Sequence, residues 1–148
     1  MLSRRLALTV ILALVLAVAT AAPAAATTVK FRITLSPAPM SFGSVPVGQM
    51  SAAQVLYATN RSAMPLRWVR SVFQARPASG TISLDVAPLP GGCLDGTEAI
   101  IEPGETCGLV AVAYMPAATG TFYIDGVSTF TDGVTTFTVA SVAKGKGV

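Results

Sequence analysis

The segment Val29-Lys30-Phe31-Arg32-Ile33-Thr34-Leu35 alternates apolar and polar residues throughout. Successive side chains of a β-strand point to opposite faces of a sheet, so this pattern predicts a strand with one buried and one solvated face. The run Ser36-Pro37-Ala38-Pro39 follows at once, and proline has no N–H to donate to a sheet ladder. We therefore expect the first strand to end there and the chain to cross to another part of the fold.

Six further segments have the composition of strands, and residues typical of turns separate them: 51–59, 66–73, 82–86, 108–114, 121–128 and 134–142. Asp132-Gly133 predicts a tight hairpin between the last two segments, because this pair tolerates the backbone angles that such turns require. The part of the chain after residue 26 shows no convincing helical periodicity. The sequence thus predicts an all-β fold of about seven strands, either an antiparallel β-sandwich of the immunoglobulin-like size or a small barrel, and it favours the sandwich.

The two expected sheets need a shared apolar core. Trp68 is interpreted as a core residue, since one indole buries a large apolar area. The full predicted core comprises Phe31, Ile33, Leu56, Trp68, Val110, Val112, Tyr114, Phe122 and Phe137.

Residues 1–26 have the pattern of a secretory signal peptide, which precedes the predicted sandwich. A basic start at Arg4 and Arg5 leads into an apolar run from Leu6 to Ala19, and small residues follow at Ala24-Ala25-Ala26. We expect cleavage after Ala26, with Ala22 as the alternative, so that residues 27–148 form a single domain. The rival interpretation is an uncleaved anchor, although the apolar run is short for a hydrocarbon core of about 30 Å. The expected location is secreted, periplasmic or in the cell envelope, with no membrane contact after cleavage.

The charge balance argues against nucleic-acid binding. The chain has 10 Lys and Arg residues against 7 Asp and Glu residues, and two of the basic residues belong to the predicted signal. Nucleic-acid binding normally needs clustered Lys and Arg. The candidate group, Arg61, Arg67, Arg70 and Arg76, falls at a turn and along one strand, where solvated charges are expected.

Cys93 and Cys107 are the two cysteines of the chain, and they follow an export signal. An oxidising compartment lets such a pair persist as a disulfide, which would stabilise the fold by about 3 kcal/mol for a loop of this length. A redox or metal role is the alternative. The spacing is not that of a thiol-exchange motif, and the sequence contains no histidine to complete a zinc site.

Four segments carry a family resemblance: Met40 to Gly48 (MSFGSVPVG), Ala58 to Leu66 (ATNRSAMPL), Glu102 to Cys107 (EPGETC) and Val112 to Thr121 (VAYMPAATGT). In this order, over about residues 36–147, they resemble an ASPM/hydin-type (ASH) immunoglobulin-like domain of the bacterial choice-of-anchor D group. The resemblance implies a binding or scaffold module without catalytic residues. It also makes Gly145 and Gly147 the glycine-rich end of the last strand.

One feature departs from the family pattern, because the run from Cys107 to Pro116 is one residue longer than usual. A β-bulge at Gly108 would absorb the extra residue and keep Val110, Val112 and Tyr114 facing the core.

Catalytic chemistry has little support in the sequence. Without histidine, Ser-His-Asp and Cys-His arrangements are impossible, so we expect no enzyme and no cofactor. Three weaker sites stay open. Calcium could bind the acidic loop from Asp95 to Glu105, and Cu(I) could bind the scattered methionines Met40, Met50, Met64 and Met115. Asn60-Arg61-Ser62 fits an N-glycosylation acceptor and is also an ordinary turn sequence.

These features predict a non-catalytic secreted or cell-surface-associated interaction or structural module that binds a protein or glycan partner. Two alternatives remain open. One is an exported protein that binds a small ligand or a metal, Ca²⁺ or Cu(I). The other is a subunit of a pilus or envelope assembly that lends or accepts a strand, since the edges of a sandwich invite β-addition.

Overall fold

The structure is a computed structural model that describes residues 30–85, 93–95 and 98–148. Within these ranges every regular element is a β-strand. The same ranges contain no helix able to span a lipid bilayer. The predicted signal peptide and the irregular stretch 88–92 lie outside the described residues.

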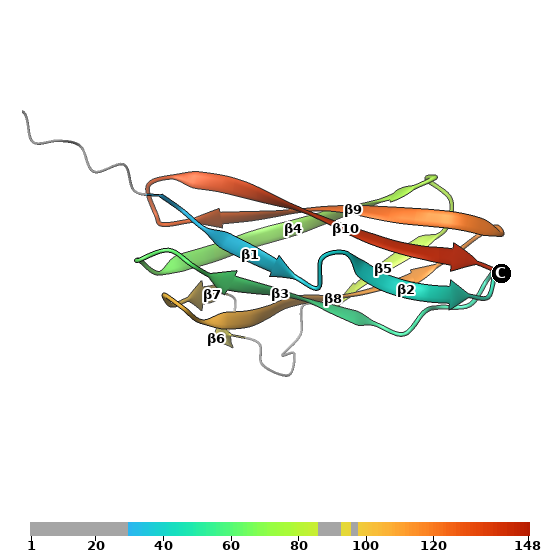
Figure 1. Cartoon of the computed structure of the whole chain (residues 1–148), viewed down its shortest axis with the longest axis horizontal. Coiled ribbons are helices and arrows are strands. Elements are labelled where there is room, and N and C mark those ends of the chain that lie inside the picture. The colour runs from blue at the N-terminus through green and yellow to red at the C-terminus, as the bar shows by residue number, and fades with distance from the viewer. Residues whose placement is uncertain (1–29, 86–92, 96–97) are drawn as a thin grey trace, which may run out of the picture.

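Ten strands form two sheets that pack face to face. The four-stranded sheet has the order β1 (Ile33–Ser36), β3 (Gln54–Asn60), β8 (Thr106–Met115), β5 (Thr81–Asp85). The six-stranded sheet has the order β2 (Met40–Val45), β10 (Thr136–Gly147), β9 (Gly120–Thr131), β4 (Leu66–Arg76), β7 (Glu98–Ile101), β6 (Leu94–Asp95). Figure 1 shows an elongated sandwich in which β4, β9 and β10 run along the whole length.

The predicted immunoglobulin-like β-sandwich is confirmed, with two corrections. The described chain has ten strands rather than about seven, because β2, β6 and β7 were not predicted. The sandwich is also not purely antiparallel, since β2 pairs parallel with β10. The segment 37–39, with its two prolines, carries the chain from β1 in one sheet to β2 in the other, as its lack of N–H donors predicted.

The core lies between the sheets and contains five of the predicted core residues: Leu56, Val110, Val112, Tyr114 and Phe122. The predicted core residues Ile33, Trp68 and Phe137 are partly buried and pack against this core, whereas Phe31 is partly buried and does not belong to it. Phe31 and Phe137 lie where the two sheets open, and the Trp68 indole N–H donates a hydrogen bond to Ser71 Oγ at 3.1 Å. The largest buried side chains that the pattern did not single out are Phe130, Met40, Leu66, Ile101, Leu109 and Ile124.

The predicted bulge is present in β8. Leu56 is opposite Val110, whereas the next residue of β3, Tyr57, is opposite Gly108, so Leu109 is the extra residue. The bulge lets both Leu109 and Val110 enter the core, with exposures of 0% and 1%.

Gly145 in β10 is required by close packing. A Cβ atom at this position would lie 2.3 Å from the Phe122 ring, far inside van der Waals contact. The absence of a side chain therefore lets the Phe122 ring approach the backbone of the last strand closely.

Candidate functional site

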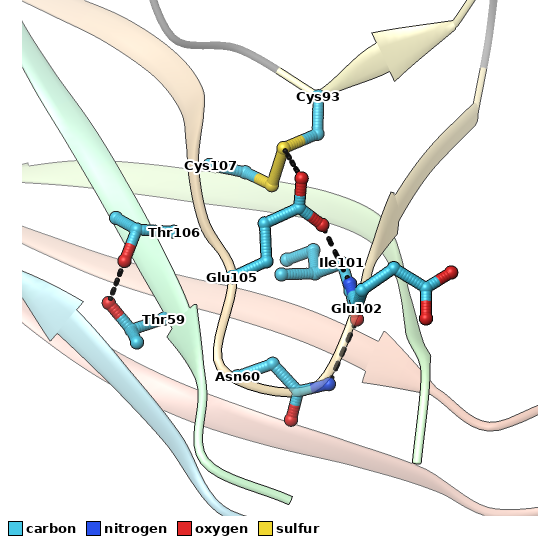
Figure 2. The surroundings of a disulfide bond; sticks show 8 residues. All are labelled: Thr59, Asn60, Cys93, Ile101, Glu102, Glu105, Thr106 and Cys107. Carbon is cyan, nitrogen blue, oxygen red and sulfur yellow. Dashed lines mark hydrogen bonds between the residues drawn. A yellow bond between two sulfur atoms is a disulfide. The ribbon is translucent and has the colours of Figure 1, made fainter.

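The two cysteines join the start of β8 to the segment before β6. The Cys93 and Cys107 sulfurs are bonded at 1.90 Å and their Cα atoms are 5.2 Å apart, within the usual range of about 4.4–6.8 Å. Cys107 is fully buried, and Cys93 is partly buried. Figure 2 shows the bond at a corner of the sandwich with the Glu105 side chain beside it, and Asn60 farther away, beyond Ile101 and Glu102. The structure thus pairs the cysteines as the sequence predicted.

Glu105 lies against this disulfide. Its Oε1 atom is 3.1 Å from Cys93 Sγ, and its Oε2 atom accepts a hydrogen bond of 2.8 Å from the Glu102 N–H (Figure 2). A sulfur in a disulfide carries no hydrogen, so the first contact is a packing contact of the carboxylate rather than a hydrogen bond.

The potential ligand atoms of Cys93, Glu105 and Cys107 lie within 4.8 Å of one another. A metal would need thiolates, however, and both sulfurs are used in the disulfide. The interval from Asp95 to Glu105, expected as one acidic loop, is instead a β6–β7 hairpin followed by a tight turn over Glu102 to Glu105. The side chains of residues 94–98 lie outside the described part.

Asn60 is a fully buried hydrogen-bonding centre of this corner. Its Nδ2 donates to the carbonyls of Met64 and Ile101 at 2.8 and 2.9 Å, and its Oδ1 accepts from the Ser62 N–H at 2.8 Å. The Asn60 N–H donates to the Glu105 carbonyl at 3.0 Å, and its carbonyl accepts from the Gly104 N–H at 2.8 Å. One side chain thus ties the end of β3 to the β3–β4 turn and to β7.

The glycosylation interpretation of Asn60 is not supported by this geometry, because both Nδ2 hydrogens are used and the group is buried in the fold. The role of Asn60 was missed in the sequence analysis. An asparagine followed two residues later by serine is a turn signal, since the Asn Oδ1 can accept from the N–H of residue i+2.

Among the side chains that the structure describes, the other sequence-predicted residues have separate positions and contacts. Arg76 forms a paired hydrogen bond with Asp125, which includes a contact from Nη2 to Oδ1 of 2.8 Å, and this bond lowers the Asp125 pKa and raises the Arg76 pKa. Met40 is 1% exposed in the core, so its thioether is not available to copper. Met50 is exposed on the loop before β3.

A groove opens on the side of the sandwich where β1 faces β10. β10 pairs with β9 over its whole length, but it pairs with β2 only from Ala143 to Gly147. Figure 1 shows β2 alongside the C-terminal end of β10. Among the described strands, none pairs with Thr136–Val142 on that side. We call this stretch the free edge of β10.

The groove has a volume of about 790 Å³ and is lined by residues 30–34, Arg61 and residues 137–139. The rings of Phe31 and Phe137 stack across it, with centroids 5.1 Å apart and an interplanar angle of 14°. Phe137 also stacks on the buried Phe130 at 5.8 Å, which fixes the pair to the core. The cationic residues Lys30, Arg32 and Arg61 are exposed along the groove.

Comparison with known proteins confirms the class of fold. The sequence matches no protein-family model and no curated protein. The solved structures that it matches include an ASH/PapD-like domain, and this likeness confirms the immunoglobulin-like fold that the resemblance predicted.

One such structure is the ASH/PapD-like domain 7 of human CEP192, with a TM-score of 0.50 and 10% identity over 78% of this chain and 84% of that chain. Another is the Vibrio cholerae VesB protease, with a TM-score of 0.52 and 16% identity over 77% of this chain but 31% of that chain. At these identities the likeness establishes the fold alone. Assignment to the choice-of-anchor D group stays a prediction.

Proposed function

We propose that this protein is an exported, non-catalytic module that binds a protein partner through a free strand edge. The observation that carries the proposal is the free edge of β10, which lies beside an open groove and pairs with no strand of the described ranges on that side. An unpaired edge offers N–H and C=O groups that a partner chain can bond, which is a common mode of peptide recognition.

The absence of catalysis is supported by the roles of three described carboxylates, those of Asp125, Asp132 and Glu105. Asp125 is paired with Arg76, and Asp132 accepts hydrogen bonds from the N–H groups of Val134 and Thr135 at 2.9 and 2.6 Å. Glu105 packs on the disulfide. Each of these groups is used by the fold, and the sequence has no histidine to act as a proton shuttle.

Export is supported by the signal-like residues 1–26 and by the disulfide, which persists in oxidising compartments. The mass of the protein recovered from the cell envelope tests this part. We expect a chain that begins at Thr27, or at Pro23 with the alternative cleavage site; an intact Met1 start in mature protein would contradict it.

Site-specific cross-linking tests the binding function. A photo-reactive amino acid at Thr138, which is exposed in the groove, is expected to capture a discrete protein in the native envelope. The matched control places the same group at Val72, which is 55% exposed on the outer face of the six-stranded sheet. Equal yields at both positions, or none at Thr138, would contradict the proposal.

The free edge also favours a second candidate, a subunit of an envelope assembly that accepts a strand from a neighbouring copy. Sedimentation distinguishes the two. Concentration-dependent oligomers that disappear when Thr138 carries a bulky adduct support the assembly subunit, whereas a monomer that still cross-links to another protein supports the binding module.

A further inference from the structure

We propose that the groove between β1 and β10 accepts an extended acidic peptide segment, which adds as a strand to the free edge of β10. The inference rests on the proposed function and names the class of partner. It combines three observations about one surface: a row of the six-stranded sheet that no described strand occupies, a cluster of cationic side chains, and an aromatic floor.

The unoccupied row follows from the way the chain changes sheets. β2 occupies the position next to β10 from Gly147 back to Ala143, and there the chain turns away through residues 37–39. β1 then pairs with β3 in the other sheet, so it does not continue the row along Thr136–Val142. An incoming segment placed in line with β2 would fill this row and complete the sheet along β10 (Figure 1).

The charge of the groove selects an acidic segment. The described residues that line it include Lys30, Arg32 and Arg61 and no acidic residue. In the described part of the chain, no carboxylate lies within ion-pair distance of these three side chains. The outward residues of the free edge, Thr136, Thr138 and Ala140, are uncharged, so they would not repel an anionic chain. Opposite charges across an interface favour association and exclude cationic partners.

The stacked rings of Phe31 and Phe137 give the groove an apolar floor with a rigid position. Successive side chains of an added strand would alternate between this floor and the solvent. A peptide fits this combination better than an acidic glycan, because a glycan would engage the cationic side chains but leave the N–H and C=O groups of the free edge without partners.

The experiment uses the protein purified after export and two synthetic peptides of about seven residues, the length of the free edge. One peptide alternates glutamate with valine, and the other has lysine in place of glutamate. Amide NMR is expected to show that the glutamate peptide, and not the lysine peptide, shifts resonances of Thr136–Val142 and slows exchange of alternate amides there. Binding is expected to weaken as salt rises.

Charge-reversal variants locate the interaction. Arg32→Glu combined with Arg61→Glu is expected to weaken binding by about tenfold or more, because two attractions become repulsions. The matched control, Arg70→Glu combined with Lys144→Glu, makes the same change in net charge on exposed residues outside the groove lining. Its affinity is expected to stay within about twofold of the unaltered protein.

Three results would overturn the inference: equal binding of both peptides, equal effects of the two double variants, or shifts that map away from the groove. A third probe, a chondroitin sulfate fragment, tests the glycan. If it binds through Arg32 and Arg61 without slowing exchange along the free edge, while the acidic peptide does not bind, the groove belongs to an acidic glycan. Cross-links at Thr138 with no acidic-peptide binding would leave the protein-binding function standing and remove only this inference.

Discussion

Replacing Asn60 with alanine is expected to destabilise the protein strongly, because the side chain satisfies three backbone groups from inside the fold. The Ile101 carbonyl and the Ser62 N–H are buried and would lose their Asn60 partner, and the partly buried Met64 carbonyl would lose its own. A buried polar group left without a partner costs about 1–3 kcal/mol, so the two buried groups together cost about 2–6 kcal/mol. Domains of this size have a total stability of about 5–15 kcal/mol.

Urea unfolding measures this loss. With a typical dependence of about 2 kcal/mol per molar urea, a loss of about 4 kcal/mol lowers the midpoint by about 2 M. Thr59→Ala is the control, since it removes a hydrogen bond to Thr106 Oγ1 of 2.8 Å on the exposed side of the same strand and is expected to cost about 1 kcal/mol or less. A loss of less than about 1 kcal/mol for Asn60→Ala would refute the reasoning.

Asn60→Asp adds a pH dependence to the same test. The introduced carboxylate would face the carbonyls of Met64 and Ile101, which repel it, so its pKa in the folded state is expected to rise above the unfolded value of about 3.9. A group with a raised folded pKa stabilises the fold below the unfolded pKa, and this stabilisation is lost as the pH rises through the folded pKa. The difference in unfolding free energy between the variant and the unaltered protein is therefore expected to become smaller at acid pH. A difference that does not depend on pH would contradict this placement of the side chain.

Three further predictions follow from other parts of the structure. Replacing both Cys93 and Cys107 with serine is expected to lower the stability by about 2–5 kcal/mol in chemical denaturation, and an unchanged midpoint would show that the bond does not constrain the fold. Gly145→Ala is expected to cost about 1–3 kcal/mol in the same assay because its Cβ would meet the Phe122 ring at 2.3 Å, so a neutral effect would contradict the packing of the last strand. The Asp132 pKa is lowered by hydrogen bonds from backbone N–H groups of its own turn. Its carboxylate therefore stabilises the fold above the unfolded pKa, and this contribution is lost as the pH falls through the folded pKa. An NMR titration that finds an unshifted or raised Asp132 pKa would contradict the turn geometry.

Features of the fold that depend on local chemistry could be predicted from the sequence. The alternation before Ser36 marks a strand, although it is shorter than the predicted stretch from Val29 to Leu35: the strand covers Ile33–Ser36, and residues 30–32 lie outside it. The prolines after it mark the crossing between sheets. The β9–β10 hairpin lies where Asp132-Gly133 predicted it, and Gly133 has a φ of 97° that favours glycine. Its turn is longer than a tight Asp-Gly turn, because residues 132–135 connect the paired Thr131 and Thr136. The bulge beside Gly108 followed from the family resemblance, because the run from Cys107 to Pro116 is one residue longer than the family's and an extra residue in a strand must leave the ladder.

Features that depend on distant parts of the chain were missed or misjudged. β2 was not predicted because its partner, β10, lies at the other end of the sequence, and the local pattern of Met40–Val45 does not reveal a parallel pairing. Alternation showed that Phe31 and Phe137 point inward, but it does not show where two sheets separate, so both residues were expected in the core rather than in a groove. The free edge of β10 results from the same pairing of β1 with β3 and could not be read from any single segment.

Residue-resolved amide hydrogen exchange along β10 tests the central claim most directly, since the proposed function depends on the free edge. In the protein without a partner, we expect alternate amides from Thr136 to Val142 to exchange quickly, because β9 bonds only one side of this stretch. Amides from Ala143 to Gly147 are expected to exchange slowly, because both β9 and β2 protect them. Addition of a partner that binds the free edge is expected to slow exchange of these alternate amides from Thr136 to Val142 and of no others. Uniformly slow exchange from Thr136 to Gly147 in the isolated protein would mean that the edge is already covered and would contradict the account.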